Sequence, residues 1–98
     1  MLRIHEILEH ISQIDWPDGE SLDALKRRLS HAELESNGYV EINIFKPPAM
    51  PGMLTLKIRK DGGELVGMVK DTLPIDLSPE AIDSFVRENA ALGYFEVI

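Results

Sequence analysis

One stretch, residues 53–70, constrains the fold of this chain more than any other, because it has the pattern of two strands joined by a tight turn. Its first half alternates apolar Leu54, Leu56 and Ile58 with polar residues, which is typical of a half-buried strand. The turn contains Asp61-Gly62, a pair that tolerates the positive φ angles hairpin turns need. Apolar residues then lead the chain back. The stretch therefore predicts a β-hairpin.

An amphipathic helix is predicted ahead of the hairpin, over residues 2–14. Isoleucine and leucine recur there at the i, i+3, i+4, i+7 spacing of a helix with one buried face. Pro17 and Asp18-Gly19 end the pattern, since proline disfavours helix at the residue before it and Asp-Gly favours a turn. We expect Trp16, beside this break, to cover the edge of the core.

A second helical segment is predicted over residues 20–36, where leucines again form a stripe. Asn37-Gly38 then provides a C-terminal stop. Ser30 and Glu33 match a capping box inside the segment. The sequence thus leaves open whether residues 20–36 form one helix or two short helices broken near Ser30.

Three further segments complete the predicted elements. Residues 39–46 alternate as a strand, and the proline-rich residues 46–52 form a loop to the hairpin. Residues 71–77 are predicted to be a second connection. Ser78 is a good N-cap for a helix that Gly93 ends, and residues 94–98 form a short final strand, which needs a paired neighbour.

The order of elements is therefore α-α-β-β-β-α-β, which predicts an α+β domain. We expect a mainly antiparallel sheet of about four strands with helices on one face. With 98 residues, the chain has the length of one domain, so residues 1–98 are expected to fold as a single compact unit. The face toward the helices would carry the alternating apolar residues Val40, Ile42, Ile44, Leu54, Leu56, Ile58, Phe95 and Val97.

Composition restricts the function. The chain has no cysteine, which excludes disulfides, thiol catalysis and Cys-ligated metal. No apolar run has the ~20 residues that a membrane-spanning helix needs, and charged residues interrupt the N-terminal segment where a signal peptide would be apolar. The sequence therefore favours a cytoplasmic protein without a membrane partner. Its net charge of −7 repels nucleic acid and favours protein partners, basic ones in particular.

Catalytic and metal-binding patterns are absent from the sequence. Serines do not stand in a nucleophile motif, and the glycines form neither a phosphate-binding loop nor a dinucleotide fingerprint. His5 with Glu9, and Glu6 with His10, have the i, i+4 spacing of a shared metal, but no further ligands are indicated. We therefore expect a protein that is not an enzyme and that holds no cofactor and no metal.

A single basic run, Lys26-Arg27-Arg28, carries the alternative function. The surrounding residues 22–42 are similar to the helix that leads into the wing strand of winged-helix DNA-binding domains. A complete module has three helices before its wing, and this chain offers one or two. A nucleic-acid-binding regulator, or a subunit whose site forms only in a larger complex, therefore remains the alternative to a protein-binding domain.

Two surfaces are candidates for binding a protein. One is the loop of residues 46–52, where Met50 is an adaptable contact residue with no periodic reason to be buried. The other is the outward face of the sheet, because aromatic residues are enriched at protein interfaces. The candidate partner-binding residues from both are Tyr39, Glu41, Phe45, Met50, Lys57, Arg59 and Tyr94. Alternatively, the loop is a rigid connector and the face is a solvated surface with cross-strand ion pairs of Glu41 with Lys57 or Arg59.

The favoured function is a small acidic protein-binding domain that occludes its partner, as an inhibitor, an immunity-type protein or a chaperone-like protein does. Acidic residues would attract a basic partner and aromatic residues would hold it. In element order and acidity the chain resembles, at the level of fold, the dimeric acidic chaperones of type III secretion, although it is shorter and no motif carries the resemblance. The sequence also leaves open a homodimer formed through the final strand or the outward face of the sheet.

Overall fold

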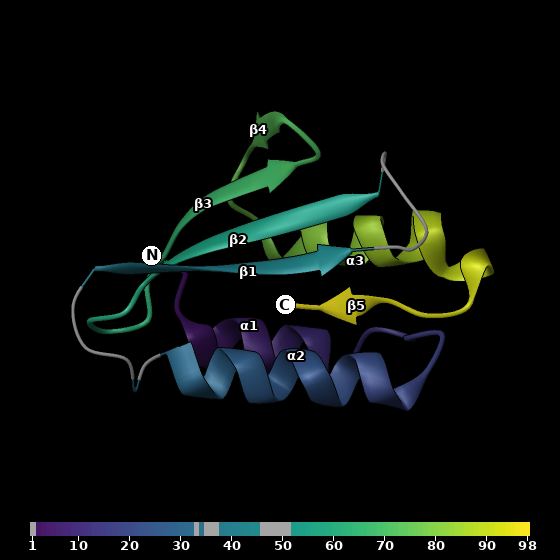
Figure 1. Cartoon of the computed structure of the whole chain (residues 1–98), viewed down its shortest axis with the longest axis horizontal. Coiled ribbons are helices and arrows are strands. Elements are labelled where there is room, and N and C mark those ends of the chain that lie inside the picture. Colours follow the sequence, from purple (N-terminus) through teal and green to yellow (C-terminus); the bar gives the residue numbers. More distant parts are fainter. Residues whose placement is uncertain (1, 33, 35–37, 46–51) are drawn as a thin grey trace.

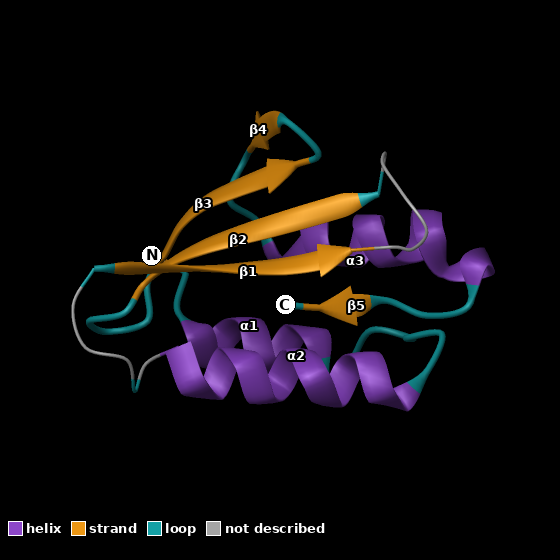
Figure 2. Cartoon of the chain, viewed as in Figure 1, coloured by secondary structure: helices purple, strands orange, loops and turns teal. Residues whose placement is uncertain are grey.

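In the computed structural model, which describes residues 2–32, 34, 38–45 and 52–98, three helices lie on one face of an antiparallel sheet (Figures 1 and 2). The predicted α+β class is confirmed. The elements in chain order are α1 (Ile4–Ile11), α2 (Gly19–Ala32), β1 (Tyr39–Phe45), β2 (Met53–Arg59), β3 (Leu65–Lys70), β4 (Leu73–Ile75), α3 (Pro79–Asn89), the 3₁₀ turn η1 (Ala90–Leu92) and β5 (Glu96–Val97).

The predicted hairpin lies at the centre of the sheet. The strand order is β4-β3-β2-β1-β5, so β2 has two strands on either side. Gly62 and Gly63 in its turn have φ angles of 83° and 65°, as the Asp-Gly signal predicted. The chain start docks on this turn, where the Ile4 N–H donates to the Gly63 carbonyl at 2.9 Å and the Arg3 guanidinium donates to the Gly62 carbonyl at 2.7 Å.

The sheet has five strands, and the prediction of about four was wrong because the predicted connection of residues 71–77 contains β4. Pro74 caused the error, since proline disfavours a central strand. In the structure β4 is the outermost strand, and Pro74 pairs with Val69 there. A two-residue turn joins β3 to β4, with Asp71 at a positive φ of 57°. An edge strand tolerates proline. Because β4 is short and Pro74 has no N–H donor, this edge discourages further strands from pairing with it.

The helices are shorter than their sequence patterns. α1 ends at Ile11 instead of residue 14. α2 runs to Ala32 and Leu34 lies in a turn, while residues 33, 35 and 36 of the predicted segment lie outside the described residues. α2 is one continuous helix through Ser30, whose hydroxyl donates to the Lys26 carbonyl at 2.8 Å, so the helix does not begin again there. α3 begins as predicted, with the Ser78 hydroxyl accepting the Glu80 N–H.

The core lies between the sheet and the helices. Every apolar position predicted to face the helices is buried or, for Val97, partly buried. Each large side chain removed from water contributes about 1.5–3 kcal/mol before conformational entropy is counted. The ring of Phe95 contacts the ring of Trp16 edge-on, with their centroids 5.8 Å apart. Its centroid is 5.6 Å from that of the Phe85 ring. Trp16 thus covers the edge of the core, as expected.

Within the described part of the chain, the helices are too short and too polar to span a bilayer.

Candidate functional site

The side of the sheet that faces away from the three helices is the candidate site, and we call it the open face. The strand register determines its membership, because residues opposite one another in an antiparallel pair point to the same side. Among the residues that the structure describes, no helix covers it (Figure 2). It consists of Tyr39, Glu41, Asn43, Phe45, Met53, Thr55, Lys57, Arg59, Gly67, Val69, Pro74 and Glu96.

One end of the open face is charged. Tyr39 lies opposite Arg59, and Glu41 lies opposite Lys57. The sequence alternative of ion pairs from Glu41 to Lys57 or Arg59 does not describe the contacts formed. The Lys57 ammonium lies over the Tyr39 ring, 4.9 Å from its centroid, and the Arg59 guanidinium is 3.9 Å from the Glu64 carboxylate. Tyr39 is 52% exposed, so its ring is available to a partner while Lys57 holds its orientation.

The other end of the open face is mainly apolar. Phe45 lies opposite Met53, and Val69 lies opposite both Thr55 and Pro74. The Thr55 hydroxyl donates to the Asn43 side-chain oxygen at 2.7 Å, which satisfies this donor and this acceptor within the face. The apolar side chains are all only partly buried or exposed. This end therefore offers a partner several partly exposed apolar side chains, bordered by Glu96, which lies opposite Phe45.

Sequence reasoning missed Val69 and Pro74 as members of this surface. The alternation of β3 is interrupted, because the β2–β3 register shifts between Lys57 and Ile58 and an extra residue enters β3 there. Pro74 was placed in a connection. A bulge leaves no mark in the apolar pattern that distinguishes it from a change of face, so only the pairing identifies Val69.

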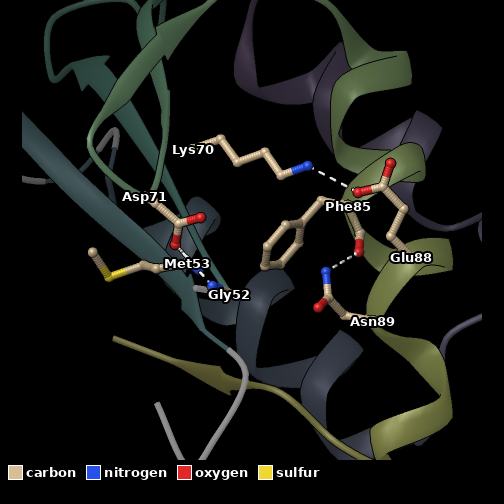
Figure 3. A network of polar contacts seen from close by, with 7 residues as sticks. All are labelled: Gly52, Met53, Lys70, Asp71, Phe85, Glu88 and Asn89. Atoms are coloured by element: carbon tan, nitrogen blue, oxygen red, sulfur yellow. Dashed lines mark hydrogen bonds and ion pairs between the residues drawn. The ribbon is translucent and has the colours of Figure 1, made fainter. Parts of the chain in front are cut away.

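Asp71 anchors the apolar end of the open face (Figure 3). Its carboxylate accepts the backbone N–H groups of Gly52 at 2.7 Å and Met53 at 3.1 Å, and its own N–H donates to the Met53 carbonyl at 2.7 Å. These hydrogen bonds from Gly52 and Met53 stabilise the ionised form and lower the pKa of Asp71. The β3–β4 turn thereby holds the start of β2 in place.

A second contact fixes the same corner to the helices. The Lys70 ammonium donates to the Glu88 carboxylate on α3 at 2.8 Å, and this bond lowers the pKa of Glu88 (Figure 3). The Asn89 amide donates to the Phe85 carbonyl at 2.8 Å in the last turn of α3. One exposed ion pair, between Lys70 and Glu88, thus links β3 to α3 on the outside of the core.

The predicted site residues divide into three groups. Tyr39, Glu41, Phe45, Lys57 and Arg59 share the open face. Tyr94 precedes β5 and lines a hollow beside α2. Met50 and the loop of residues 46–51 lie outside the described residues, while Gly52 at the end of the predicted loop is bound by Asp71. The structure therefore brings five of the seven together on one surface.

A metal site is not formed by the residues that the structure describes, among which no three His, Asp or Glu side chains gather as ligands. The basic run lies on α2, and its middle residue, Arg27, lines the hollow beside β5 together with Asp18, Glu20, Asp23 and Glu96. Arg27 therefore faces an acidic surface, which does not favour a phosphate backbone.

Comparison of the chain with family models, with curated proteins and with solved structures finds no match. The case for a function therefore rests on the open face and on the chemistry of its own residues.

Proposed function

We propose that this protein is a small, acidic, non-enzymatic protein-binding domain that occludes a partner with the open face of its sheet. A single observation carries the proposal: a continuous five-stranded face, apolar at one end and charged at the other, has no helix over it among the described residues. Sheets that face water on one side normally alternate apolar inward and polar outward residues. Here Phe45, Met53 and Val69 break that rule on the outward side.

The overall charge of the protein and the side chains of the open face have different roles in this mechanism. The net charge of −7 attracts a partner with basic surface and speeds its encounter. Tyr39, pre-oriented by Lys57, and the apolar cluster around Phe45 then exclude water and hold the complex. A rigid sheet suits this role, since little side-chain or backbone order is lost on binding. Inhibition, immunity or chaperoning by surface occlusion all require this kind of contact.

The test compares two charge-reversal variants, Lys57→Glu on the open face and Arg87→Glu on the outer side of α3. Both change the net charge equally, and Arg87 forms only an exposed i, i+4 ion pair with Asp83. Each tagged protein is incubated with lysate of the source cells at low and at moderate salt. We expect one stoichiometric partner to be recovered with the wild type and with Arg87→Glu, and to be lost or strongly reduced with Lys57→Glu.

Recovery of no stoichiometric partner at either salt concentration contradicts the proposal, and so does equal recovery with both variants. Solution mass is measured on the same samples. A homodimer that Lys57→Glu dissociates would show that a second copy occupies the open face, and the occlusion of another protein by this surface would then be ruled out.

A further inference from the structure

A hollow of about 740 Å³ lies beside the last strand, between this strand and α2. α2 forms one wall with Glu20, Asp23, Ala24 and Arg27, which follow the i, i+3, i+4, i+7 spacing of a single helix face. Residues 94–98, with β5, form the other wall. The hollow therefore has the shape of a groove between a helix and the outer strand of a sheet, a geometry in which proteins accept an added strand.

The backbone of β5 presents hydrogen-bonding groups to this groove. Asn43 and Ile98 exchange both of their N–H···O bonds at 2.9 Å, which defines them as a hydrogen-bonded pair. The next pair, Ile44 with Val97, is then of the other type, and the Val97 N–H and C=O turn away from β1. Val97 is therefore the residue of β5 whose backbone groups face an incoming strand.

Phe95 is the preceding residue whose backbone groups point away from β1, and the Ser21 side chain already contacts them. The outward N–H of Phe95 donates to the Ser21 hydroxyl oxygen at 2.9 Å, and this hydroxyl lies 2.8 Å from the Phe95 carbonyl. The side chain of Ser21 thus occupies the place that a strand partner would take at Phe95. Among the residues that the structure describes, none takes the corresponding place at Val97. The backbone groups of Ile98 bond Asn43, so an added chain would pair with Val97 alone.

Charge selects the occupant of the groove. Asp18, Glu20, Asp23 and Glu96 line it, against a single base, Arg27. A second copy of this chain would bring the same carboxylates against them, in addition to the repulsion between two molecules of net charge −7. A chain segment with Lys or Arg at alternate positions places these side chains toward the acidic wall of α2, since alternate residues of a strand share a face.

We propose that this groove binds an extended basic peptide segment, which pairs with the Val97 backbone and sets its basic side chains against Glu20 and Asp23. This surface adjoins the open face at Glu96, which belongs to both. A partner protein with a basic, extended tail would use both, whereas a peptide alone would use only the groove.

The test uses a blocked synthetic peptide of alternating lysine and valine, seven residues long, and its glutamate–valine counterpart. Each is titrated into the ¹⁵N-labelled protein at low salt. We expect the basic peptide to shift the amide signals of Val97, its neighbours in β5 and residues 20–27 of α2, and the acidic peptide to shift none of them. Binding should weaken about tenfold when the salt concentration rises from low to physiological levels.

Two variants test the two halves of the proposal. Glu20→Lys with Asp23→Lys, both exposed, should weaken binding about tenfold, while Glu9→Lys with Asp61→Lys, which changes the net charge equally elsewhere, should leave it unchanged. Val97→Pro removes the outward donor and should weaken binding about fivefold. The amide spectrum of Val97→Pro shows whether this variant is folded. If it is not folded, the charge variants alone test whether the groove binds the basic peptide.

Three results would overturn the proposal. One is that the basic peptide shifts signals elsewhere or none at all. The second is that Glu20→Lys with Asp23→Lys binds as tightly as its control, or that folded Val97→Pro binds as tightly as the wild type. The third is that the β5 signals shift with protein concentration alone as the mass doubles, because a second copy would then occupy the groove.

Discussion

The carboxylate of Asp71 accepts the backbone N–H of Gly52 at 2.7 Å, although 19 residues separate the two in sequence. This bond joins the β3–β4 turn to the start of β2, and the Met53 N–H donates to the same oxygen at 3.1 Å. Asp71 also adopts a positive φ of 57°, which asparagine and aspartate tolerate better than other non-glycine residues. One residue therefore forms the turn and fixes the apolar end of the open face.

Replacement of Asp71 by asparagine should remove a pH-dependent part of the stability. The backbone donors of Gly52 and Met53 lower the pKa of Asp71 in the folded state, so this stabilisation is complete above the unfolded-chain pKa and is lost as the pH falls through the folded pKa. Asp71→Asn keeps the positive φ but lacks the charge. We expect the variant to be less stable than the wild type at pH 7, with the difference shrinking below about pH 4.

Urea denaturation from pH 7 into the acidic range measures this difference. The other carboxylates titrate in both proteins and cancel in the comparison. A difference in unfolding free energy that stays constant across the range would show that Asp71 contributes no charge-dependent stabilisation.

Replacement of Ser21 by alanine should destabilise the protein by about 1–3 kcal/mol, because it leaves the Phe95 N–H buried without an acceptor. The Asp18 carboxylate would also lose its contact with the hydroxyl, which is now 2.8 Å away. Ser30→Ala on the same helix is the matched control. Ser30 is exposed and its hydroxyl bonds only within α2, so its loss should change the unfolding free energy by less than about 0.5 kcal/mol. Equal effects of the two substitutions in urea denaturation would remove the role assigned to Ser21.

Replacement of Gly62 by alanine should destabilise the central hairpin by about 1–2 kcal/mol. Gly62 has a φ of 83°, which costs an L residue energy, and an added Cβ would lie 3.0 Å from the Arg3 guanidinium nitrogen. Gly19→Ala provides the comparison, since Gly19 begins α2 and an added Cβ there meets open space. This substitution should leave the stability of the protein unchanged or raise it slightly. Thermal unfolding of the two variants should differ in sign or clearly in size; similar melting temperatures would contradict the assignment of strain to Gly62.

Substitutions on the two sides of the sheet should have different effects. On the helix side they should lower stability, and on the open face they should weaken partner binding. Leu56 is fully buried against the helices, so Leu56→Ala should cost about 2–5 kcal/mol of stability. Phe45 is only partly buried on the open face, so Phe45→Ala should cost less than half as much while weakening the complex with the captured partner at least tenfold. Chemical denaturation and a binding titration at a temperature where both variants are folded measure the two effects. A partner that binds Phe45→Ala as tightly as wild type would exclude the apolar end from the interface.

Local patterns in the sequence were sufficient for most of the elements. The alternation in β1 and β2 identified their inward faces, and Ser78-Pro79 marked the start of α3. The pairing of strands could not be predicted from local sequence patterns. β4 was missed because Pro74 is acceptable only at an edge, and whether a strand lies at an edge depends on the strand order of the whole sheet.

The candidate site shows the same division. Tyr39, Glu41, Phe45, Lys57 and Arg59 were identified from alternation alone, because a strand that buries one set of residues must expose the other. Val69 was hidden by the bulge in β3, and the groove beside β5 was hidden because Ser21 and Phe95 are 74 positions apart.

The sequence by itself determined that this chain forms a central hairpin with one apolar side and a separate outward set of charged and aromatic residues, since turn chemistry and the two-residue period of a strand act over a few positions. Only the tertiary structure decided what surrounds the hairpin: which strands lie at the edges, and that the Ser21 side chain contacts the Phe95 backbone just before the last strand. These outcomes depend on contacts between distant segments, whose energies arise only when the whole core packs.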